Sequence, residues 1–146
     1  MVAFHAASGA AAGSLSRSRL AGLVAGPLLH VAADRVPHRH PRHEAWEYVT
    51  GMLVIGLLVR RRGLVDAATL GAVSAVLPDL EHLAAGRRRK LFHPFGPERR
   101  DGAGLSVEAQ LLLSATLLFP VLRRPGSEAI DGQPTPFHRG RADKPA

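Results

Sequence analysis

Histidine and aspartate recur at short spacings in this chain, in patterns that could hold a metal ion. The clearest pattern is His30-x3-Asp34-x2-Pro37-His38. His30 and Asp34 are four residues apart, so they share one face of a helix. Pro37 ends that helix, because proline disfavours helical geometry in the residue before it, and His38 follows in the turn. Two imidazoles and a carboxylate so placed could converge on one cation.

A second pattern follows Pro78, where Asp79 and His82 are three residues apart and again share a helix face. Two further histidines stand alone: His5 in the first apolar segment and His93 in a later loop. Each pattern also has a plain interpretation. Asp79 would begin a helix, the isolated histidines would lie on the surface, and His30 with Asp34 would form a buried hydrogen-bonded pair.

The apolar segments predict an all-α fold, an up-and-down bundle of about five helices over residues 3–15, 20–35, 44–59, 64–83 and 105–122. Short loops make successive helices antiparallel. Helix ends that are far apart in sequence then share one pole of the bundle. The candidate metal ligands all fall at that pole: His5, His30, Asp34, His38, Asp79, His82 and His93.

The chain contains no cysteine, so thiolate metal sites are excluded. A mixed histidine and aspartate shell suits a divalent metal, with Zn²⁺ favoured and Mn²⁺ or Fe²⁺ as alternatives. Such a site activates water and polarises a phosphoryl or acyl oxygen. Glu81 and Glu108 are expected at the same pole and are the candidates for a catalytic general base.

Arginines collect between apolar segments, as in membrane helices joined by charged loops. This segregation predicts a multi-pass integral membrane domain over residues 1–122, in contact with lipids and their anionic headgroups. A basic tail rich in proline and glycine follows over 123–146, and we expect it to be disordered. The helices are roughly 13 to 20 residues long, whereas a full span needs about 20. A compact bundle outside the bilayer is therefore also compatible with the pattern.

The net charge of +7 would also suit a nucleic-acid partner. Aromatic residues make up only 5% of the chain, which disfavours base-stacking platforms, so nucleic acid is the least favoured partner. A non-catalytic membrane protein is the other alternative, with the polar cluster as a structural network or a site for metal storage or transport. The sequence leaves the substrate, the membrane orientation and the oligomeric state open.

Together these motifs resemble the small integral-membrane, metal-dependent hydrolase-like proteins, which are distantly similar to zinc-dependent phospholipase C and the P1-type nucleases. The resemblance covers about residues 3–119. It rests on His5 with Gly9, the two Asp–His motifs, His93 and a late helix that starts with Gly and Gln. It implies a membrane-bound hydrolase of phosphoester or lipid-like substrates. The implied ligands are His5, His30, Asp34, Asp79, His82 and His93, with His38 in an additional or supporting role. The Thr-His-Ser that follows a histidine in larger members is absent here.

Overall fold

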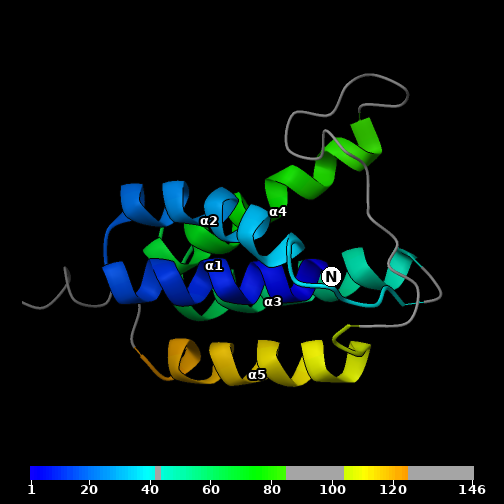
Figure 1. Ribbon diagram of the computed structural model, residues 1–146. Helices are drawn as coiled ribbons and strands as arrows, with labels where there is room; N and C mark the ends of the chain where they lie inside the picture. Colours follow the sequence, from blue (N-terminus) through cyan, green and yellow to red (C-terminus); the bar gives the residue numbers. More distant parts are fainter. Residues whose placement is uncertain (42–43, 85–103, 125–146) are drawn as a thin grey trace, which may run out of the picture.

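Five α-helices make up most of residues 1–41, 44–84 and 104–124, the part of the chain described by the computed structural model (Figure 1). They are α1 (Val2–Ser16), α2 (Arg19–Asp34), α3 (Glu44–Arg62), α4 (Ala67–Ala84) and α5 (Val107–Arg123). The described residues include no β-strand, only an isolated bridge between His38 and Leu105. The prediction of an all-α bundle of five helices is confirmed.

Successive helices run in opposite directions (Figure 1). The N-terminal ends of α1, α3 and α5 therefore lie at the same pole as the C-terminal ends of α2 and α4, as the short connections predict. The predicted boundary between a helical domain and a tail stays a prediction, because residues 125–146 lie outside the described residues.

Polar side chains mark where the helices begin. Ser106 caps α5, and its hydroxyl accepts a hydrogen bond from the Ala109 amide at 3.2 Å. Ser18 caps α2 in the same way. α4 continues past Pro78 to Ala84, and Figure 1 shows its last turns leaning away from the bundle.

Small residues fill the centre of the bundle and let three helix backbones touch. α1 packs against α2 and α4, and its buried positions are mainly alanine and glycine. A Cβ atom added at Gly9 would collide with the carbonyl oxygen of Gly71 in α4. A Cβ atom added at Gly26 in α2 would collide with Ser74 and Ala75, which also lie in α4. Small residues in α1 thus allow the helices to approach closely.

The predicted multi-pass integral membrane domain is wrong, because no helix in the described ranges is long and apolar enough to cross a bilayer. A span needs about 20 apolar residues, whereas α1 and α2 have 15 and 16. α3 has 19 residues but carries Glu47 near its start and three arginines in its last turn. Large apolar side chains nevertheless remain exposed on several helices, including Leu20, Leu28, Met52, Leu112 and Phe119.

A buried ion pair joins three helices at the opposite pole. Arg62, at the end of α3, donates to both carboxylate oxygens of Asp66 at 2.8 and 3.2 Å. The same guanidinium donates to the carbonyl oxygens of Val121 and Arg124 at the end of α5. Asp66 also accepts from the amide of Ala68 in the first turn of α4. This cluster thus fixes the ends of α3 and α5 to the start of α4.

The close approach of α1 and α4 predicts opposite effects for the same substitution at two helical glycines. Gly9→Ala must push the backbone of α4 away, so we expect a loss of about 1–3 kcal/mol in the free energy of unfolding. Gly56→Ala meets no atom within 4 Å and should stabilise α3 by about 0.5–1 kcal/mol. Urea denaturation of both variants measures the difference. A Gly9→Ala variant as stable as Gly56→Ala would contradict this packing.

Candidate metal centre

Three of the predicted ligands meet between α1 and α2. His5 Nε2 lies 3.2 Å from Asp34 Oδ1, and His30 Nε2 lies 3.2 Å from Asp34 Oδ2. One potential ligand atom from each residue falls within 4.8 Å of the other two. Ligand atoms around a tetrahedral zinc ion with bonds of 2.1 Å are about 3.4 Å apart. The spacing therefore suits one small cation with little rearrangement.

The helix geometry explains why these residues meet. His30 and Asp34 are one turn apart at the end of α2, and His5 lies in the first turns of α1, which runs antiparallel to α2. The two imidazole rings have centroids 4.0 Å apart. Both histidines are buried, whereas the Asp34 side chain is 28% exposed, so the carboxylate closes the cluster on the solvent side.

The orientation of His30 is set from α4. Its Nδ1 lies 2.8 Å from the carbonyl oxygen of Ala75, and a carbonyl can only accept, so Nδ1 carries the proton and donates. In neutral His30 the other nitrogen, Nε2, is then an acceptor directed at the Asp34 carboxylate. Two acceptors 3.2 Å apart repel unless a proton or a metal cation lies between them. Metal-binding histidines are commonly oriented by such a carbonyl.

The protonation equilibria follow from burial and from Asp34. Burial lowers the pKa of His5 to about 4, against a weaker opposing hydrogen bond to Asp34. Burial also disfavours charged His30, but the Asp34 hydrogen bond and the charges of Asp79 and Asp34 raise its pKa above the usual value. Burial would raise the pKa of Asp34, yet its hydrogen bonds with His30 and His5 hold it well below the ordinary range. The carboxylate is therefore ionised across the whole physiological range.

Asp79 brings a fourth candidate ligand from α4. Its Oδ1 lies 3.9 Å from His30 Nε2, and its side chain is 15% exposed. The structure thus gathers four predicted ligands, His5, His30, Asp34 and Asp79, from three helices.

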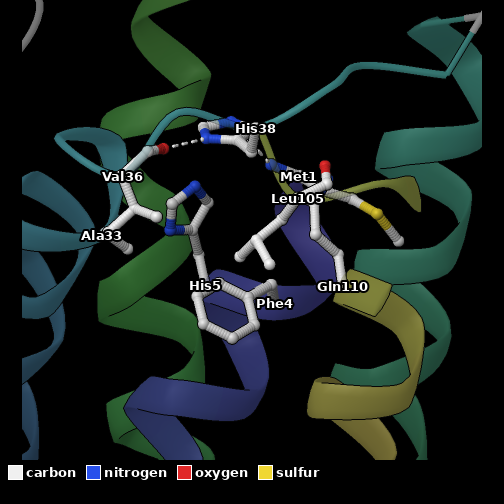
Figure 2. A pocket seen from close by; sticks show the side chains of 8 residues that line it. All are labelled: Met1, Phe4, His5, Ala33, Val36, His38, Leu105 and Gln110. Atoms are coloured by element: carbon white, nitrogen blue, oxygen red, sulfur yellow. Dashed lines mark hydrogen bonds between the residues drawn. The ribbon is translucent and has the colours of Figure 1, made fainter. Parts of the chain in front are cut away.

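His38 lies near this group but is held by other partners. Its Nδ1 donates to the Val36 carbonyl at 2.9 Å, and its Nε2 lies 3.5 Å from the amino group of Met1. It lines a cavity of about 60 Å³ that His5 also lines (Figure 2). Burial lowers the pKa of His38, which favours the neutral ring. The supporting role implied for His38 stays a prediction.

The remaining candidates are not joined to this cluster in the described residues. Glu108 is exposed in the first turn of α5, where a hydrogen bond from Ser106 lowers its pKa. His93 and the side chains of Glu81 and His82 lie outside the described residues. Their proposed roles as ligand or general base therefore stay predictions.

Two further groups support the site: the Ala75 carbonyl, which was not predicted from the sequence, and Gln110, which entered the sequence analysis only as part of the late helix start. The Ala75 carbonyl has no signature in the sequence, because every residue has one. Gln110 is 2% exposed and donates to the carbonyl oxygens of Arg39 and Leu105, at 2.9 and 3.1 Å. It thereby ties the segment after α2, which carries His38, to the start of α5. The available signal in the sequence was a polar amide side chain, Gln110, directly before the apolar run LLLSATLL.

Comparison of the chain with protein-family models, with curated proteins and with solved structures gave no match. The assignment of this site therefore rests on its own geometry and on the motifs of the sequence.

The two buried imidazoles predict a maximum of stability near the ordinary histidine pKa of 6.5 in the metal-free protein. His5 binds its proton only near pH 4 when folded, so the unfolded state holds more protons between pH 6.5 and 4. Stability should fall over that range, on the order of 2–4 kcal/mol. The raised pKa of His30 gives a stabilising contribution that is complete below pH 6.5 and lost as the pH rises through the raised value.

Urea denaturation from pH 4 to 9 in the presence of a chelator measures the loss of stability on both the acidic and the alkaline side. His30→Gln should remove the loss on the alkaline side and leave the acidic side in place. NMR titration that placed both rings at a pKa near 6.5 would contradict the described environment.

Proposed function

We propose that the protein is a metal-dependent hydrolase of phosphoester or lipid-like substrates, with its metal held by His5, His30 and Asp34 and completed by Asp79. The observation that carries the proposal is the fixed orientation of His30. Its Nδ1 is committed to the Ala75 carbonyl, so its Nε2 can serve as a metal ligand beside the Asp34 carboxylate.

The donor set supports a divalent cation of the zinc type. Two neutral imidazoles and one or two carboxylates suit Zn²⁺, with Mn²⁺ or Fe²⁺ as alternatives. A cation held there would supply Lewis acidity and lower the pKa of a water molecule. The likeness of the motifs to small metal-dependent hydrolases, and through them to zinc-dependent phospholipase C, points to the same chemistry.

The residues would divide the work as their positions suggest. Asp34 offers one oxygen toward each histidine, and so holds both rings around the cation. A substrate would approach His5 through the cavity that His5 and His38 both line. For the general base, Glu81 and Glu108 are candidates from the sequence pattern alone, since Glu108 is exposed and is not joined to the cluster.

A purely structural polar network is the second candidate, and one observation favours it. The pKa of His30 is raised, which fits an imidazolium that donates to Asp34 with no metal present. A proton on Nε2 and a metal at the same place exclude one another. Metal binding should therefore release a proton from His30, and this release separates the two functions.

Metal titration by calorimetry, with zinc and the purified chain, tests the site directly. The wild type should bind zinc, and Asp34→Ala or His30→Ala should weaken binding at least 100-fold, because each removes a ligand. His40→Ala is the matched control: His40 lies at the same pole but pairs with Glu47 at 2.7 Å. Binding that is absent in the wild type, or equally weakened in His40→Ala, would refute the metal site.

Hydrolysis of a chromogenic phosphodiester by the zinc-loaded chain then tests the activity. We expect turnover that chelation removes and Asp34→Ala lacks, while His40→Ala retains it. Zinc binding without turnover would leave a non-catalytic metal site and exclude the hydrolase for this class of substrate.

A further inference from the structure

Two cavities lie side by side at the pole that carries the candidate metal centre. The first, of about 60 Å³, is lined by His5, His38 and mostly apolar neighbours, which are Met1, Phe4, Ala33, Val36, Leu105 and Gln110. The second, of about 150 Å³, is lined by Met1, Pro41, Trp46, Glu47, Thr50, Val107 and Leu111. Met1 lines both cavities, so the two spaces are neighbours.

The first cavity reaches one of the candidate metal ligands, because His5 forms part of its wall (Figure 2). Figure 2 shows the side chain of Met1 on the side away from Ala33, extending toward α3. A methionine side chain is unbranched and flexible, so it can shift to join the two spaces when a ligand enters.

The second cavity is a groove between the first turns of α3 and α5, lined mainly by apolar carbon. α5 makes few contacts with α3, so the two helices leave this space between them. An apolar cavity of about 150 Å³ is large enough for a molecule the size of benzene. The carboxylate that lines it, Glu47, is already paired with His40 at 2.7 Å.

We propose that the α3–α5 groove binds the aliphatic chain of the substrate, so that the substrate is a phosphoester with an alkyl chain. The phosphoryl group would lie at His5, His30 and Asp34, and the chain would pass Met1 into the space lined by Trp46, Val107 and Leu111. This inference rests on the proposed hydrolase for the position of the headgroup. The chain site rests on the groove alone.

The positive charge at this pole fits such a headgroup. Arg35 and Arg39 are exposed on the segment that follows α2 and carries His38. Hydrolysis would add water across the ester P–O bond, giving a phosphate and an alcohol, with the proton of the water passing to the alcohol oxygen. The reaction needs no oxidant or other co-reactant.

The only tryptophan in the chain reports on the groove, because Trp46 lines it. Its fluorescence can follow the binding of butyl, hexyl, octyl and decyl phosphate below their micellar concentrations, with inorganic phosphate as the chain-free probe. We expect about fourfold tighter binding for each added methylene. The gain should stop once the chain exceeds the groove. A gain that continues through decyl phosphate would indicate unspecific partition and overturn the proposal.

A pair of equal substitutions separates the groove from the rest of the surface. Val107→Phe fills the groove and should abolish the dependence on chain length, while inorganic phosphate binds as in the wild type. Val24→Phe makes the same change at a position in α2 that is 56% exposed and lines neither cavity, and it should behave as the wild type. Equal behaviour of the two variants would overturn the proposal.

Repeating the series with a chelator distinguishes the two proposals. Removal of the metal should abolish the affinity for inorganic phosphate and leave the dependence on chain length. A chain-length effect without any zinc binding would uphold the groove and refute the metal centre. Zinc binding without a chain-length effect would uphold the metal centre and refute the groove.

Discussion

The contact between the backbones of α1, α2 and α4 is the constraint on which the rest of this structure depends. Glycines on all three helices remove the side chains that would keep them apart, and Gly9 and Gly71 lie against each other. His5 is one turn from Gly9 in α1, and Ala75 is one turn from Gly71 in α4. The distance between helices therefore sets the distance between the imidazoles of His5 and His30 and the carbonyl that orients His30.

The polar cluster is arranged so that each member limits the freedom of the next. Ala75 fixes one nitrogen of His30, His30 directs the other at Asp34, and Asp34 reaches His5 with its second oxygen. No member can change its protonation without affecting its neighbour, because both imidazoles are buried and each lies 3.2 Å from the Asp34 carboxylate. A cation would replace the shared proton and keep the same geometry.

Much of this arrangement could be predicted from the sequence, because helix periodicity and short loops determine which ends share a pole. The placement of His5, His30, Asp34 and Asp79 together followed from that reasoning. The role of the Ala75 carbonyl did not, since a backbone group leaves no mark in the sequence. The membrane-spanning prediction failed for a different reason. It relied on the segregation of apolar and charged residues, whereas spanning depends on the uninterrupted length of each apolar helix, and these are too short.

The three consecutive arginines at the end of α3 look alike in the sequence but differ in their surroundings. Arg60 and Arg61 are exposed, whereas Arg62 is buried against Asp66 and two carbonyl oxygens. Dissolved salt screens charges that face water and hardly reaches a pair enclosed by protein. Raising the ionic strength should therefore weaken the attraction of the exposed arginines for anions and leave the junction of α3, α4 and α5 intact. One run of identical residues thus contains both a salt-sensitive surface and a salt-resistant joint.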